Sequence, residues 1–98
     1  QATLVWGTTT PFMPDKTAGN FAVEQQNTIA AKIMAAQSIP SVDLYSRVTA
    51  KCGDLYKKCE ICDDESKYHP AVYCGYHYTG AGFAYISDLV SAAIRKHL

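Results

Sequence analysis

The chain has 98 residues, of which 48% are hydrophobic and 18% are charged, and its nine basic and nine acidic side chains cancel to a net charge of zero. This composition is typical of one small globular domain and excludes a disordered chain. Neither charge sign forms a long run, so nucleic acid and anionic membranes are not expected as main partners, and no apolar stretch reaches the length of a transmembrane segment. Because Gln1 precedes the first predicted strand without an initiating methionine, we expect a mature or cut fragment.

The first predicted element is a short strand over residues 2–6, where the run Ala-Thr-Leu-Val-Trp is rich in strand-forming side chains and ends at Gly7. Its lack of alternation predicts a strand that is covered on both faces, as in parallel sheets enclosed by helices. Residues 8–19 then form a turn-rich loop. This loop follows the carboxyl end of the strand, where open α/β sheets bind their ligands.

A helix is predicted next, over residues 20–37, with Asn20 as its N-cap and with an apolar side that would cover the sheet. Residues 39–44 follow as a second short strand, and Asp43 is expected to cap a short helical turn over residues 45–50. The order strand, helix, strand predicts a right-handed parallel crossover.

The last predicted element is an amphipathic helix over residues 83–98, whose apolar side chains recur at helical spacing. Thr79 can cap its first turn, and three basic residues end it where cations suit the helix dipole. His77 therefore lies just outside a helix N-terminus. The partial positive charge there favours the neutral imidazole that a general base needs. The alternative interpretation is a histidine that packs in a surface loop.

Residues 51–76 show no helix or strand period and form a long, cysteine-rich loop. An even number of clustered cysteines favours two disulfides and a secreted or luminal protein, with three possible connectivities. Zinc is the alternative, because two of the cysteines have knuckle spacing and His69 or His77 could supply a further ligand; free thiols are a third possibility. The four cysteines are Cys52, Cys59, Cys62 and Cys74.

Two strands and two long helices do not complete a doubly wound sheet. A two-stranded parallel pair leaves ladder edges and apolar faces uncovered, which is unfavourable for both hydrogen bonding and burial. We therefore expect further strands from another polypeptide segment, either an upstream part of the same gene product or a separate subunit.

The order of these features resembles the carboxyl-terminal portion of the SGNH (GDSL-like) hydrolase family. Residues 4–11, Leu-Val-Trp-Gly-Thr-Thr-Thr-Pro, look like the penultimate strand and its loop, and residues 20–37 are similar to the helix that follows. Residues 42–45, Val-Asp-Leu-Tyr, resemble the last strand. Residues 77–83, His-Tyr-Thr-Gly-Ala-Gly-Phe, resemble the last block of the family, in which the base histidine precedes a helix. The resemblance covers nearly the whole chain.

The resemblance implies an α/β fold in which residues 1–98 supply the last two strands, and their helices, of a flavodoxin-like three-layer parallel sheet. It also implies a secreted esterase that hydrolyses a carbohydrate O-acetyl or lipid acyl ester without a cofactor or metal. His77 matches the family's general base, which takes the proton of the serine hydroxyl and passes it to the leaving group. The serine nucleophile and the oxyanion residues would lie on another segment, so we expect no hydrolysis by this chain alone.

One departure from the family pattern concerns the acid, because Cys74 stands three residues before His77, where the family usually has an aspartate. A sulfur atom cannot stabilise imidazolium as a carboxylate does. The site would then work as a Ser-His dyad, or a backbone carbonyl or another acid such as Asp63, Asp64 or Glu65 would orient the ring. The alternative is a catalytically inactive SGNH-like domain that serves as a disulfide-stabilised structural or carbohydrate-binding part of an extracellular assembly, and a zinc-binding module is the third interpretation.

Overall fold

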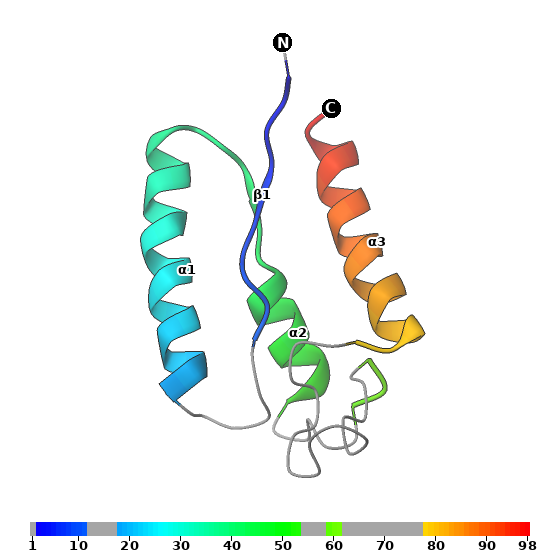
Figure 1. The fold of residues 1–98 in the computed structure, drawn as a ribbon. Helices are drawn as coiled ribbons and strands as arrows, with labels where there is room; N and C mark the ends of the chain where they lie inside the picture. Colours follow the sequence, from blue (N-terminus) through cyan, green and yellow to red (C-terminus); the bar gives the residue numbers. More distant parts are fainter. Residues whose placement is uncertain (1, 12–17, 54–58, 62–77) are drawn as a thin grey trace.

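The structure is a computed structural model that describes residues 2–11, 18–53, 59–61 and 78–98 (Figure 1). In chain order its elements are β1 (Trp6–Gly7), α1 (Ala18–Ala36), β2 (Ser41–Val42), α2 (Leu44–Cys52) and α3 (Gly80–Lys96). The described residues therefore form a mixed α/β structure with a two-stranded sheet and three helices.

The two strands pair in parallel, with Trp6 opposite Ser41 and Gly7 opposite Val42, which confirms the predicted parallel strand-helix-strand order. Figure 1 shows β1 passing between α1 and α3. Each strand is shorter than predicted, with two residues rather than five or six. On β2 the reason is local, because the strand is preceded by Pro40, which has no N–H to donate, and is followed at once by the cap of α2.

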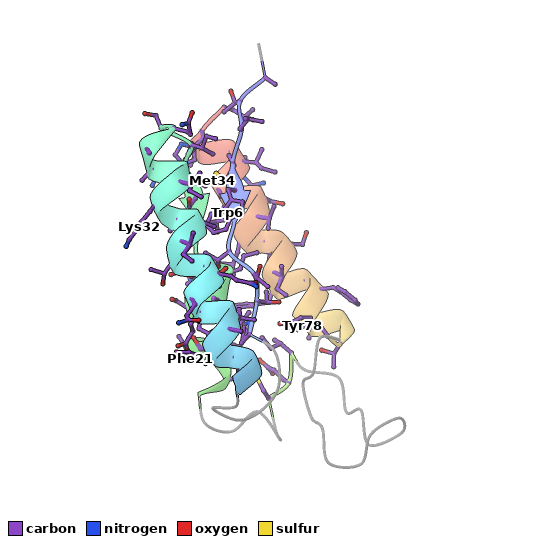
Figure 2. All side chains as sticks on the ribbon, turned by 60° about the vertical axis from the view of Figure 1, so that its left-hand side comes forward. Trp6, Phe21, Lys32, Met34 and Tyr78 are labelled. Atoms are coloured by element: carbon purple, nitrogen blue, oxygen red, sulfur yellow. A yellow bond between two sulfur atoms is a disulfide. The ribbon has the colours of Figure 1, made fainter. Side chains whose placement is uncertain are left out.

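Helix α1 begins earlier than predicted, and its predicted apolar side covers the sheet only in part, because Phe21, Ile29 and Ile33 of that side are exposed. In Figure 2, Met34 lies on the side of α1 that faces β1, whereas Lys32 projects away from it. The helix begins at Ala18, so Asn20 lies inside its first turn and not at the N-cap. Asn20 is buried, with 6% of its surface exposed, and the prediction that it caps the helix is wrong.

The predicted caps of the other two helices are confirmed. The Asp43 carboxylate accepts a hydrogen bond of 3.1 Å from the Ser46 N–H at the start of α2, which extends further than the predicted turn. At the start of α3, the Thr79 hydroxyl accepts a hydrogen bond of 3.1 Å from the Gly82 N–H. Basic side chains occupy the last turn of α3, where they complement the helix dipole.

The buried core lies between α2, the short segment 59–61 and α3, and not on the sheet. Its fully buried members are Val48 and Ile61, with Cys52 beside them. Four partly buried residues pack against this cluster: Cys59, Tyr78, Tyr85 and Ile86. The start of α3 is therefore fixed by contacts with α2 and with residues 59–61.

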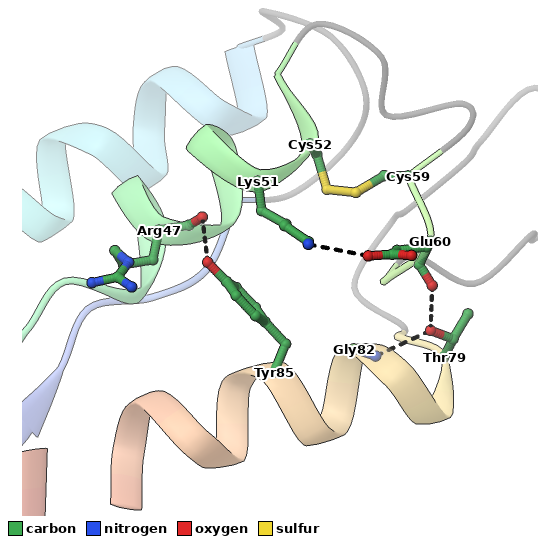
Figure 3. Close-up of a disulfide and its surroundings, with 8 residues drawn as sticks. All are labelled: Arg47, Lys51, Cys52, Cys59, Glu60, Thr79, Gly82 and Tyr85. Atoms are coloured by element: carbon green, nitrogen blue, oxygen red, sulfur yellow. Dashed lines mark hydrogen bonds and ion pairs between the residues drawn. A yellow bond between two sulfur atoms is a disulfide. The ribbon is translucent and has the colours of Figure 1, made fainter. Parts of the chain in front are cut away.

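A disulfide joins Cys52 at the end of α2 to Cys59, with an S–S distance of 2.02 Å (Figure 3). Cys62 and Cys74 lie outside the described residues, so their pairing stays a prediction. Because sulfurs in a disulfide are not thiolates, Cys52 and Cys59 cannot serve as zinc ligands in this state. The described residues also contain no group of three or more metal-ligating side chains. The zinc interpretation thereby loses two of its candidate ligands.

Polar contacts reinforce the same junction. Lys51 forms an ion pair with Glu60, with 3.1 Å between Nζ and Oε1, and its ammonium lies 5.7 Å from the centre of the Tyr85 ring. The Tyr85 hydroxyl donates a 3.2 Å hydrogen bond to the Arg47 carbonyl, and the Thr79 hydroxyl donates one of 2.7 Å to the Glu60 carbonyl (Figure 3). These contacts tie α3 to both α2 and residues 59–61.

Large apolar side chains remain exposed on the two long helices. On α1, Phe21, Ile29 and Ile33 expose 61%, 60% and 54% of their surfaces, and on α3 Phe83 exposes 65%. Exposed large apolar side chains thus occur on both of the long helices, although single exposed apolar residues are normal on a protein surface. Among the described helices, none combines the length and hydropathy needed to cross a bilayer.

Candidate functional site

The carboxyl ends of β1 and β2 are linked to each other by side chains. Thr8 follows β1, and its hydroxyl accepts a 2.8 Å hydrogen bond from the Tyr45 N–H and donates one of 3.3 Å to Asp43 Oδ1. Parallel strands end at the same edge of a sheet, which is where α/β proteins place their ligands. The link therefore fixes the loop after β1 against the start of α2 at the predicted site edge.

The Asp43 carboxylate is stabilised in its ionised form. Partial burial raises the pKa of Asp43, but the hydrogen bonds donated by Ser46 and Thr8 outweigh it, so the pKa lies below the ordinary value of 3.8. A carboxylate that is ionised and engaged in a helix cap is unsuited to act as a general acid. This agrees with the prediction that Asp43 is a cap.

Replacing Asp43 with Asn is expected to lower the free energy of unfolding at pH 7, with a difference from wild type that shrinks in acid. The folded-state pKa is depressed, so its stabilisation is complete above the ordinary value of 3.8 and disappears as the pH falls through the lower folded value. Urea unfolding of both proteins between pH 2 and pH 7 measures this. Asp88→Asn, which removes an exposed carboxylate from α3, controls for net charge. A difference that is constant with pH would contradict the assignment.

Helix α1 also reaches this edge, through two side chains that the sequence analysis did not identify as site residues. The Tyr45 hydroxyl donates a 2.6 Å hydrogen bond to Glu24 Oε1. The Asn27 amide makes a pair of 2.9 Å bonds with the backbone of Thr9, accepting from its N–H and donating to its carbonyl. These contacts join residues about 20 positions apart, so no local spacing in the sequence indicated them.

Tyr78 brings the start of α3 to the same edge. Its side chain is half-buried against the core cluster, and its hydroxyl oxygen is buried without a hydrogen-bond partner among the described residues. Burial raises the pKa of Tyr78 above 10.0, and the Thr10 side chain partly offsets this, although the two groups do not reach good hydrogen-bond geometry. The start of α3 therefore lies close to the loop that follows β1, through the neighbourhood of Tyr78 and Thr10.

The candidate base itself, His77, lies outside the described residues, as do Asp63, Asp64, Glu65 and Cys74. Its role and theirs stay predictions. Comparison of the chain with protein-family models, with curated proteins and with solved structures gives no match. The family resemblance therefore depends on the residues quoted for it.

At the carboxyl edge of the sheet, the described side chains hold the backbone in place, and none of them is an activated nucleophile. The Thr8 hydroxyl is engaged with Asp43 and Tyr45, and the described residues place no histidine beside it. An activated nucleophile or a histidine base at this edge would therefore have to come from outside the described residues.

Proposed function

We propose that this chain is the carboxyl-terminal part of a secreted SGNH-type serine esterase, with His77 as general base toward a serine on another polypeptide segment. The observation that carries the proposal is the position of Tyr78, the residue after His77, beside Thr10 in the loop that follows β1. Helix α3 begins two residues later, at Gly80. The candidate base is thus adjacent in the chain to the sheet edge where such folds bind ligands.

The incomplete sheet supports the same proposal. A parallel pair of two strands, flanked by helices with exposed apolar side chains, fits the last two strands of a flavodoxin-like sheet that another segment completes. The disulfide between Cys52 and Cys59 is compatible with an extracellular protein. The substrate class implied by the family is a carbohydrate O-acetyl or lipid acyl ester.

The reaction would follow the usual acyl-transfer sequence. The serine hydroxyl attacks the ester carbonyl while His77 takes its proton, and His77 then passes that proton to the leaving alcohol. Water repeats the two steps on the acyl-serine and releases the acid. With Cys74 in the acid position, a backbone carbonyl or one of Asp63, Asp64 and Glu65 would orient the imidazole, unless the site works as a Ser-His dyad.

A second candidate function is a catalytically inactive SGNH-like domain that acts as a structural or carbohydrate-binding component of an extracellular assembly. Two observations favour it. Cys74 replaces the usual acid, and the best-packed part of the described chain is the cross-linked junction around Cys52 and Cys59, not the site edge.

Treatment of the assembled, secreted protein with a fluorophosphonate distinguishes the two functions. An activated serine displaces fluoride and forms an Oγ–P bond, so we expect a single covalent adduct on the partner segment and none on this chain, by intact-mass and terminal-sequence analysis. Protein unfolded in urea is the control and should stay unlabelled. No adduct on the folded assembly would favour the inactive domain, and an adduct on a serine of residues 1–98 would contradict the proposed division of the site.

A further inference from the structure

The cap of α3 is held by two backbone carbonyls of residues 59–61. The Thr79 hydroxyl donates a 2.7 Å hydrogen bond to the Glu60 carbonyl, and the Thr79 N–H donates one of 3.2 Å to the Ile61 carbonyl. The same hydroxyl accepts a 3.1 Å hydrogen bond from the Gly82 N–H. Because the hydroxyl proton points to Glu60, a lone pair is free to face Gly82. The geometry of the cap therefore depends on where residues 59–61 lie.

Side chains attach this segment to α2, because within the described chain it belongs to no helix or strand. The disulfide bonds Cys59 to Cys52, the last residue of α2 (Figure 3). The ion pair between Lys51 and Glu60 leaves 39% and 71% of the two side chains exposed, and an ion pair this accessible to water contributes little. Ile61 adds the burial of its side chain. The disulfide is therefore the one covalent attachment between α2 and the described segment that holds the cap.

The same buried cluster supports the residue that reaches the site edge. Cys52 belongs to this cluster, and Cys59 and Tyr78 both pack against it. Tyr78 in turn lies beside Thr10, in the loop that follows β1. A change in the bond between the two cysteines consequently reaches the site edge by two routes, through the cap of α3 and through the packing of Tyr78.

We propose that the disulfide is a redox switch for the start of α3, in which oxidation of Cys52 and Cys59 completes the Thr79 cap and fixes Tyr78 at the site edge. Oxidation forms one S–S bond and passes two electrons and two protons from the thiols to an acceptor disulfide, such as oxidised glutathione, which becomes two thiols. The inference rests on the proposed function, because a secreted esterase would then complete its site only in an oxidising compartment.

Two cysteine variants of the assembled protein isolate this bond. In Cys62→Ser/Cys74→Ser, the cysteines that remain in this chain are Cys52 and Cys59, so dithiothreitol breaks one bond of the chain and oxidised glutathione restores it. Cys52→Ser/Cys59→Ser keeps the other two cysteines and cannot form the bond. It should therefore match the reduced state without any reductant.

Amide hydrogen exchange in these proteins measures the switch. The Gly82 and Phe83 amides donate to Thr79, so we expect loss of the disulfide to speed their exchange about tenfold or more. The Trp6 amide donates to the Pro40 carbonyl and should stay within about twofold, since the paired strands lie outside the junction. No change at Gly82 and Phe83 would overturn the proposal. An equal change at Trp6 would also overturn it, because the disulfide would then hold the whole fold and not the start of α3.

Substitution of Thr79 tests the route of the coupling. Thr79→Val keeps the side-chain shape but removes the hydroxyl, so its Gly82 amide should exchange fast even in the oxidised protein, and reduction should add less than about threefold. Thr79→Ser keeps the hydroxyl and should respond to reduction as wild type does. An equal response to reduction in Thr79→Val and Thr79→Ser would overturn the proposal.

Fluorophosphonate labelling of the same proteins separates the switch from the esterase. We expect the labelling rate to fall about tenfold on reduction and to recover with oxidised glutathione. A rate that does not change while the Gly82 amide loosens would overturn control of the site by the disulfide. Redox-dependent exchange without labelling in either state would retain the switch at α3 and reject the esterase.

Discussion

Replacing His77 with Ala in the assembled protein is expected to lower kcat for ester hydrolysis by about 10³-fold or more, because the serine hydroxyl then has no base. The alcohol is a weak nucleophile at neutral pH, and the leaving group also loses its proton donor. Turnover of an O-acetylated sugar and of a short acyl ester measures the effect. Circular dichroism of the variant should match wild type, since His77 precedes the cap of α3 and is not part of the helix.

The matched control for this experiment is His97→Ala. His97 ends α3, at the opposite end of the helix from the candidate site. We expect kcat to stay within about twofold of wild type, because surface substitutions away from a site change little. If His77→Ala retains wild-type turnover, His77 is not the base, and the inactive-domain function becomes the better account of the chain.

Replacing Gly82 with Ala is expected to destabilise the chain by about 3 kcal/mol, the upper part of the usual range for overpacking. An added Cβ would clash with the Ile61 carbonyl oxygen and would lie 2.9 Å from Tyr78 Cβ, so the backbone must move. The loss of contact at residues 59–61 exceeds the gain of about 1 kcal/mol that Ala brings to a helix. Urea or thermal unfolding of the oxidised protein measures the difference.

Gly80→Ala provides the matched control in the same helical turn. A Cβ at Gly80 meets nothing within 4 Å, so only helix propensity changes. We expect its stability to equal that of wild type or to exceed it by up to about 1 kcal/mol. Equal effects of the two substitutions would contradict the close packing of Gly82 against Ile61.

The sequence predicted the helices well because their signals are local. Thr79 and Asp43 cap their helices through residues three positions later, and such contacts depend only on nearby chain. The parallel pairing also followed from the order of elements. The N-cap at Asn20 failed because α1 begins at Ala18, and a polar residue of the first turn resembles a cap in sequence.

The remaining features depend on contacts between distant segments. Asn27 meets Thr9, and Tyr85 meets Arg47, across separations of 18 and 38 residues, which no local pattern indicates. The sequence left the pairing of the four cysteines open, so it did not predict the disulfide between Cys52 and Cys59 in particular. The predicted strands indicated a core against the sheet. The buried cluster instead lies around Cys52 and Ile61, between α2 and α3. Of the candidate site, the sequence predicted the edge, and the contacts that hold the backbone there are visible only in the fold.

The amide of Asn27 has a consequence for how a third strand would align. Sliding such a strand along β1 by one residue would exchange all its side chains between the α1 and α3 faces, and carrying it past Gly7 would require Thr9 to release Asn27. A strand that extended past Gly7 would therefore have to replace both hydrogen bonds that Asn27 makes with the Thr9 backbone.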